Sequence, residues 1–356
     1  MTQVLVVDPE RPDARAIAIA AEEIRRGRLV AFPTETVYGL GAHALDPAAV
    51  ERLFRAKGRP ATDPVIVHIS SMGQLGEIVH GVAPSARDLS EAFWPGPLTL
   101  ILFKRDVVPD AVTAGGLTVG VRMPSHPVAL ALLEAAKVPV AAPSANRFSG
   151  PSPTTARHVL ADLDGAIDLI LDAGPTPIGV ESTVLDLTVS PPLVRRPGGV
   201  TLERLRQVVP TVAVRGETHA ETAPQPAPGQ LLRHYAPHHR LTLYRGPVDR
   251  VVARVADDTR SMVSQGLRVG VLAPREDLLA LAPRVAAVAA TGRVVTRRCG
   301  ARVDPAEVAR DLFGALRELD AEDIDVMLAV APEPEGLGTA VIDRLTRAAE
   351  GRVVYL

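Results

Sequence analysis

At 356 residues, the chain is longer than the size at which a single hydrophobic core usually stops growing, so two domains are expected. Its 47% hydrophobic and 22% charged residues argue against a disordered or fibrous protein. A net charge of −2 and 3% aromatic residues argue against a general attraction to nucleic acid or acidic membranes, so a small ligand is favoured. The single cysteine, Cys299, excludes an internal disulfide, and neither a leader pattern nor a bilayer-length apolar run is found, so we expect a cytoplasmic protein with no membrane partner.

Helical patterns alternate with short β-branched runs in the first part of the chain, which is typical of an α/β domain. Asp46 and Pro47 have the residue types of a helix N-cap and first turn, and apolar residues follow them at helical spacing. We predict strands at residues 29–32, 65–69, 98–103, 118–122, 138–142, 169–171 and 184–187.

Residues 215–228 lack apolar periodicity, which predicts an interdomain linker. We therefore assign residues 1–212 to a first domain, 213–238 to a linker and 239–356 to a smaller α/β domain. Asp304, Pro305 and Glu307 form a predicted capping box that opens a helix running to about Leu319. The second domain has predicted strands at residues 241–244, 269–272, 294–296 and 326–330.

A hydroxyl-rich turn, residues 32–41, directly follows the first predicted strand, and loops at strand ends are where α/β sheets bind ligands. Gly39, Gly41 and Ala44 formally match a dinucleotide fingerprint. The next strand, however, ends in Ser70 and Ser71 instead of the acid that would hold a ribose. The simpler interpretation of these glycines is a tight turn.

Residues 57–64 would place Lys57 and Arg59 at the mouth of a buried strand. These cations could compensate a triphosphate, since the chain has no Walker loop, or they could only offset the macrodipole of a helix C-terminus. His68 alternates with apolar neighbours on the following strand, which is compatible with a core residue or with a ligand.

Two further strands end in polar turns, at residues 118–124 and 140–152. Arg122 would be expensive to bury unless it faced an anion. Turn formation explains the segment 143–146 as well as ligand binding does. Arg195 and Arg196 precede Pro-Gly-Gly, which indicates either a charged turn or a phosphate site. A metal site at His234, His238 and His239 would lack a carboxylate or cysteine at convincing spacing, so no protein-only metal site is expected.

Taken in order, these segments resemble the YrdC family, whose signature is a lysine and an arginine two apart, followed much later by Ser-x-Asn. The signature is matched here by Lys57, Arg59, Ser144 and Asn146. The resemblance covers roughly residues 12–209 and continues at 228–237 and 336–345, which resemble the two-domain subfamily. It implies an N-terminal YrdC-like twisted mixed α/β sheet with a large concave cavity, and a smaller Rossmann-like C-terminal domain.

The resemblance also implies a nucleotidyltransferase, an L-threonylcarbamoyladenylate synthase. Such an enzyme joins L-threonine, bicarbonate or CO2, and ATP into threonylcarbamoyl-AMP, releases pyrophosphate, and serves N6-threonylcarbamoylation of the tRNA adenosine next to the anticodon. Mg²⁺ would accompany the ATP. By analogy the partner is the transferase that moves the threonylcarbamoyl group, with a weak tRNA contact. Two alternatives are an RNA-binding module and a carbamoyl-transfer domain that shares this fold.

Residue roles carry over position by position. Lys57, Arg59, Ser144 and Asn146 form the catalytic signature. Threonine contacts are implied for Thr36, His68, Arg122, Ala142 and Ser182, and ATP contacts for Arg59, Asp63, Thr118, Ser144, Ser152, Arg196 and Tyr235. The family more often has asparagine at the position of Asp63, and a carboxylate there would repel phosphates unless it turned toward the metal or the adenosine. Residues 233–237 suggest a lid in which Tyr235 closes over the cavity and shields a labile carbamate from water.

Overall fold

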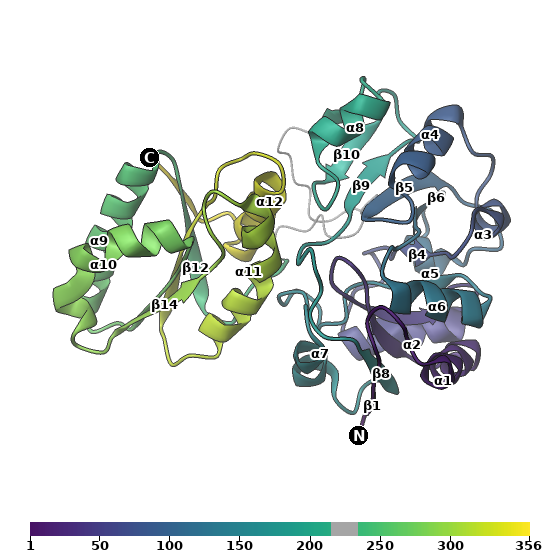
Figure 1. The fold of residues 1–356 in the computed structure, drawn as a ribbon, viewed down its shortest axis with the longest axis horizontal. Helices are drawn as coiled ribbons and strands as arrows, with labels where there is room; N and C mark the ends of the chain where they lie inside the picture. Colours follow the sequence, from purple (N-terminus) through teal and green to yellow (C-terminus); the bar gives the residue numbers. More distant parts are fainter. Residues whose placement is uncertain (215–233) are drawn as a thin grey trace. The chain divides into compact units, whose positions relative to one another are not determined.

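The computed structural model describes residues 1–214 and 234–356 (Figure 1). The described chain forms two compact units. The first contains residues 1–148 and 152–214, and the second contains Ser149–Pro151 and residues 234–356. The predicted linker at 215–228 and the resembling segment at 228–233 lie outside the described residues, and the domain boundaries at 212 and 239 stay a prediction.

The first unit is built on a mixed sheet of eleven strands in the order β1-β8-β2-β3-β7-β4-β6-β5-β9-β10-β11. Its strands are β1 (Gln3–Val6), β2 (Val30–Pro33), β3 (Tyr38–His43), β4 (Val67–His68), β5 (Leu98–Phe103), β6 (Thr118–Arg122), β7 (Val140–Ala141), β8 (Leu169–Asp172), β9 (Thr183–Asp186), β10 (Leu193–Arg196) and β11 (Ala213–Val214). Its helices are α1 (Ala14–Arg25), α2 (Pro47–Lys57), α3 (Met72–Ile78), α4 (Pro84–Phe93), α5 (Asp110–Thr113), α6 (Pro127–Ala136), α7 (Ala156–Leu163) and α8 (Leu202–Val208).

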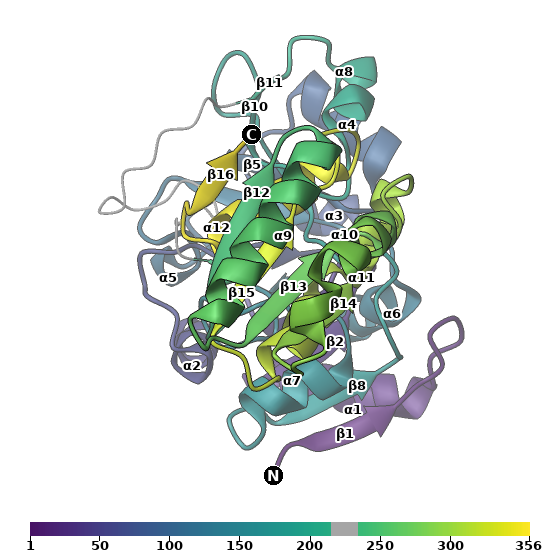
Figure 2. The ribbon, with the colours of Figure 1, turned by 90° about the vertical axis from the view of Figure 1, so that its left-hand side faces the viewer.

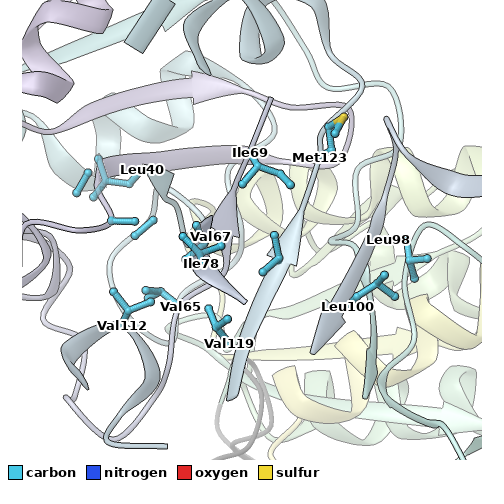
Figure 3. Close-up of a cluster of buried hydrophobic side chains, with 14 of the residues drawn as sticks. Leu40, Val65, Val67, Ile69, Ile78, Leu98, Leu100, Val112, Val119 and Met123 are labelled. Carbon is cyan, nitrogen blue, oxygen red and sulfur yellow. The ribbon is translucent and has the colours of Figure 1, made fainter. Parts of the chain in front are cut away.

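Both faces of this sheet are covered, so its strands alternate between two apolar cores. In β2, Ala31 belongs to one core, while Val30 and Phe32 belong to the other, as the two-residue period of a strand requires. The second core is filled from α1 and α6. Figure 3 shows part of the first core, in which Val67 and Val119 lie among side chains from neighbouring strands and helices. The strand ends that carry polar residues are therefore held by packing on two sides.

Helix α2 begins at the signal predicted from its sequence and ends at a glycine. The Asp46 side chain accepts a hydrogen bond from the N–H of Ala48, and Pro47 occupies the first turn, as predicted. Gly58 ends the helix in the left-handed conformation, with φ +65°, and its N–H reaches the carbonyl of Arg55. This cap reverses the chain between Lys57 and Arg59, and both side chains are buried.

The second unit has a five-stranded, fully parallel sheet in the order β14-β13-β15-β12-β16. Helices α9 and α10 lie side by side on one face and α11 and α12 on the other (Figures 1 and 2). The elements are β12 (Arg240–Arg245), α9 (Val248–Ser264), β13 (Val269–Ala273), α10 (Arg275–Ala289), β14 (Val294–Arg298), α11 (Pro305–Asp320), β15 (Val326–Val330), α12 (Gly338–Ala348) and β16 (Val353–Tyr355). Within the described ranges, no helix is long and apolar enough to cross a membrane.

The structure corrects several local predictions. The expected turn at residues 32–41 narrows to 34–37, because residues 38–43 form β3, paired with β2. Arg195 and Arg196 lie in strand β10 and not in a turn. The predicted capping box is only half right: the Asp304 side chain caps α11, whereas the Glu307 side chain accepts from the N–H of Ala301 and does not return to Asp304.

Candidate active site

The turn between β2 and β3 presents three polar side chains that are all buried. The Thr34 hydroxyl lies 2.8 Å from the Thr36 hydroxyl and donates to the carbonyl of Val37 at 2.7 Å, which closes the turn through a side chain. Glu35 lies between them and is 6% exposed. The turn is therefore rigid and carries one acid and two hydroxyls.

Arg122, the last residue of β6, points at this turn. Its guanidinium forms an ion pair with Glu35 at 2.6 Å, donates to the Thr36 hydroxyl at 3.0 Å and donates to the carbonyl of Gly96 at 3.2 Å. We expected a buried Arg122 to face an anion, and Glu35 of the protein is one such anion. Glu35 escaped the sequence analysis because its partner is far away in the chain.

His68 ends β4 and pairs in register with Arg122 on the adjacent parallel strand. Burial, and then the charge of Arg122, lowers the pKa of His68 to about 3, so the imidazole is neutral near pH 7. Ala142 follows β7, and its N–H donates to the carbonyl of Ile66, just before β4. Thr36, His68, Arg122 and Ala142 come from adjacent parts of the sheet.

Arg196, at the end of β10, is oriented by Ser182. Its guanidinium donates to the Ser182 carbonyl at 3.0 Å and to the Ser182 hydroxyl at 3.1 Å. That hydroxyl also lies 2.8 Å from the hydroxyl of Thr99 on β5. Ser182, implied for threonine, therefore contacts Arg196, implied for ATP, and Thr99 contacts Ser182 from β5. Arg195 faces the other way and pairs with Asp186 at 2.6 Å.

Three of the four signature residues, Lys57, Ser144 and Asn146, form a compact group. The Lys57 ammonium donates to the carbonyls of Ser144 and Asn146, both at 2.5 Å. The Ser144 hydroxyl donates to the Asn146 side-chain oxygen at 2.5 Å. An isolated β-bridge between Gly39 and Ser144 ties the Ser-x-Asn loop to β3. The long sequence gap within the signature is closed by these contacts.

Arg59 is held by a buried acid and two aromatic rings. It pairs with Asp63 at 2.9 Å, and both side chains are at most 4% exposed. Its guanidinium lies 6.0 Å from the ring centroids of Phe54 and Phe148. The unusual acid at position 63 therefore has a described role beside Arg59, which the sequence analysis did not consider.

The two remaining residues of the first unit that are implied for ATP, Ser152 and Thr118, lie on different elements. Ser152 is fully buried and donates to Glu181, a second buried acid that the sequence analysis missed. Thr118 starts β6, at the end of the strand opposite Arg122, about 13 Å away at the usual rise of a strand. Its ladder partner is Phe103.

Tyr235 and His234 belong to the second unit. The Tyr235 ring lies 5.5 Å from the ring of Phe313 and 4.0 Å from that of His234, and the Arg344 guanidinium lies 5.3 Å from the Tyr235 ring centroid. His238 and His239 both contact Asp320, at 2.7 and 3.0 Å. Among residues 1–214 and 234–356, no group of three His, Cys, Asp or Glu side chains could hold a metal ion.

Backbone contacts join the loops of the first unit around the β2–β3 turn. The N–H of Gly179 donates to the carbonyl of Thr36, the N–H of Tyr38 to that of Pro153, and the N–H of Ala145 to that of Tyr38. The Ser-x-Asn loop and the segments that contain Ser152 and Ser182 are therefore all anchored to one short stretch of chain. The predicted substrate roles of these residues, the concave cavity and the lid stay predictions.

Comparison with known proteins gives matches along both units. A family model described as "Telomere recombination" (Sua5_yciO_yrdC) matches residues 22–198, and one described as "Threonylcarbamoyl-AMP synthase, C-terminal domain" matches residues 200–350. Threonylcarbamoyl-AMP synthase of Pyrococcus abyssi is 43% identical over 350 residues, 97% of each chain. The protein of the same name from Bacillus subtilis is 42% identical over 339 residues, 95% of this chain and 94% of the relative.

The chain belongs to the Sua5 family of threonylcarbamoyl-AMP synthases. Its fold matches the crystal structure of P. abyssi Sua5 complexed with L-threonine, with a TM-score of 0.90 and 43% identity over 100% of both chains. A structure of the H234A/Y235A variant of P. abyssi Sua5 also matches with a TM-score of 0.90, at 42% identity over 100% of this chain and 98% of that one. The predicted family, α/β fold class and synthase activity are confirmed by these matches.

Proposed function

We propose that this Sua5 chain forms threonylcarbamoyl-AMP and pyrophosphate at the buried polar group of its first unit. One observation carries this assignment: four cations of the first unit, Lys57, Arg59, Arg122 and Arg196, are each at most 8% exposed. Buried cations are costly without anions, and the two acids Asp63 and Glu35, which pair with Arg59 and Arg122, balance two of these four charges. ATP, bicarbonate and the threonine carboxylate are all anionic. Such a site overcomes the mutual repulsion of its substrates.

The threonine half of the site consists of Arg122, His68 and Thr36. Arg122 pairs with the substrate carboxylate, and its orientation is already fixed by Glu35 and Gly96. Because His68 is uncharged at neutral pH, it offers a hydrogen bond to threonine without adding a second positive charge beside Arg122. A site that hydrogen-bonds the substrate hydroxyl discriminates strongly against amino acids that lack it.

The reaction has two steps. The neutral amine of threonine attacks the carbon of CO2, which forms the N–C bond of a carbamate, and the nitrogen releases a proton to solvent water. A carbamate oxygen then attacks the α-phosphorus of ATP, and the bond to pyrophosphate breaks. Lys57, Arg59 and Arg196 stabilise the negative charge on the phosphates, so catalysis rests on alignment and electrostatics and not on a protein nucleophile.

Mg²⁺ enters this proposal with ATP. The two buried acids on the nucleotide side are engaged, Asp63 with Arg59 and Glu181 with Ser152, so phosphate oxygens and water are the expected ligands. The ion would neutralise phosphate charge during pyrophosphate departure. Delivery of the product to a threonylcarbamoyl transferase, a weak contact with tRNA and a cytoplasmic location belong to the same proposal.

Pyrophosphate release measured with ATP, Mg²⁺, bicarbonate and each amino acid in turn tests the function. Threonine should give the strongest signal, and omission of bicarbonate should abolish it. Serine is the matched substrate control because it lacks only a methyl group. Pyrophosphate release that does not depend on threonine would contradict the proposal.

A further inference from the structure

Three residues that belong to the N-terminal part of the sequence are grouped structurally with the second unit. Ser149–Pro151 form one compact unit with the C-terminal residues. In the chain they lie between Asn146 of the signature and Ser152. The second unit therefore holds the backbone that connects a residue of the catalytic signature to a residue assigned to ATP.

Two hydrogen bonds hold this segment. The N–H of Ala236 donates to the carbonyl of Ser149 at 2.7 Å, and the guanidinium of Arg317 donates to the carbonyl of Pro151 at 2.5 Å. Ser149 is in the left-handed conformation, with φ +68°, which a serine seldom adopts without external support. Pro151 and Ser152 are buried.

Arg317 lies in the last turn of α11, four residues after Phe313, so the two side chains lie on the same helix face. Phe313 is fully buried and packs on the Tyr235 ring. This face therefore supports both Tyr235 and the Pro151 carbonyl, and a rigid helix is a good platform for such a contact.

We propose that Arg317 is a positioning residue for the nucleotide half of the reaction, an inference that rests on the function proposed above. The Pro151 carbonyl oxygen shares a planar peptide unit with the N and Cα atoms of Ser152. Fixing that oxygen orients the start of Ser152, while Glu181 accepts the hydrogen bond of its hydroxyl at the other end. The threonine half is built on β2, β4, β6 and β7, none of which contains this peptide unit.

The test is an Arg317→Met variant, which keeps an unbranched apolar stem and removes the guanidinium with its donors. We expect about a tenfold rise in the KM for ATP, or about 1.4 kcal/mol, with the KM for threonine unchanged. Arg317→Lys, which keeps one charged donor, should recover part of the loss. Arg310→Met on the same helix is the control, because Arg310 is exposed and contacts only Glu307 and Asp311 among the described residues.

Direct calorimetry with Mg²⁺ and ATP, without bicarbonate, separates this inference from the proposed function. Weaker ATP binding by Arg317→Met than by Arg310→Met supports the positioning role. This holds even if the wild type forms no threonine-dependent pyrophosphate, because that result would overturn only the proposed function. Equal ATP binding by the two variants would overturn the inference. So would a proportionate rise in both KM values, since this would indicate a purely structural role.

Discussion

Replacing Asp63 by asparagine tests whether Arg59 binds the phosphates of ATP. The change keeps the shape of the side chain and removes the negative charge 2.9 Å from Arg59. Both side chains are at most 4% exposed, and loss of one partner from a buried ion pair costs about 3 kcal/mol. We therefore expect the first unit of the free variant to be less stable by about this amount.

ATP should restore part of that loss, because its phosphates supply the missing negative charge to Arg59. We expect the variant to bind ATP about tenfold more tightly than the wild type, which corresponds to about 1.4 kcal/mol. Trp94, the single tryptophan, is buried in the first unit, so its fluorescence follows unfolding of that unit in urea with and without ATP. Calorimetry gives the ATP affinity.

Asp186→Asn is the matched control for this experiment. Asp186 pairs with Arg195 at 2.6 Å, and the two side chains are 3% and 13% exposed, but Arg195 faces away from the site. The control should lose stability without gaining ATP affinity. If Asp63→Asn were destabilised and bound ATP no better than the wild type, Arg59 would not meet the phosphates, and the nucleotide half of the proposal would be wrong.

Three further outcomes follow from the site. Lys57→Met removes the ammonium that holds both the Ser144 and Asn146 carbonyls and should reduce threonine-dependent pyrophosphate release at least about 100-fold; a parental rate would contradict its role. Arg122→Lys loses the planar fork and should raise the KM for threonine about tenfold while leaving the KM for ATP unchanged; equal effects on both would count against the assignment. The pKa of His68 is about 3 in the folded protein and 6.5 in the unfolded chain, so the unfolded chain takes up a proton first and the wild type loses stability as the pH falls from 6.5 toward 3. Between pH 7 and pH 5 this loss in the free energy of unfolding is about 2 kcal/mol, and His68→Gln should avoid it. Urea unfolding at the two pH values measures the difference.

Local chemistry made much of the fold predictable. Asp46 and Pro47 predicted the start of α2 because an N-cap depends on neighbouring residues. The β-branched runs predicted strands such as β5, β6 and β15 close to their observed bounds. Strand β3 was not predicted because its glycines and hydroxyl-rich approach have the composition of a turn. Its pairing with β2 and β7 overrides that local preference.

The site was predictable as a set of residue types but not as a network. Lys57 and Ser144 could be named from the signature, yet the contact between the lysine ammonium and the serine carbonyl spans 87 positions. Glu35, Thr99 and Glu181 were missed because each acts on a partner brought near only by strand order. An acid inside a hydroxyl-rich turn, as at Glu35, was the one available signal, and a single sequence does not reveal its partner.

The middle position of the Lys-x-Arg signature, Gly58, forms the left-handed cap that ends α2. With φ +65° and nothing within 4 Å of a hypothetical Cβ, this residue is selected for backbone conformation and not for the space around it. The Cβ of an alanine would meet no obstacle, yet the left-handed conformation would cost such a residue about 1 kcal/mol. The middle position of the signature thus lies in the turn between two buried cations, although it contributes no functional group.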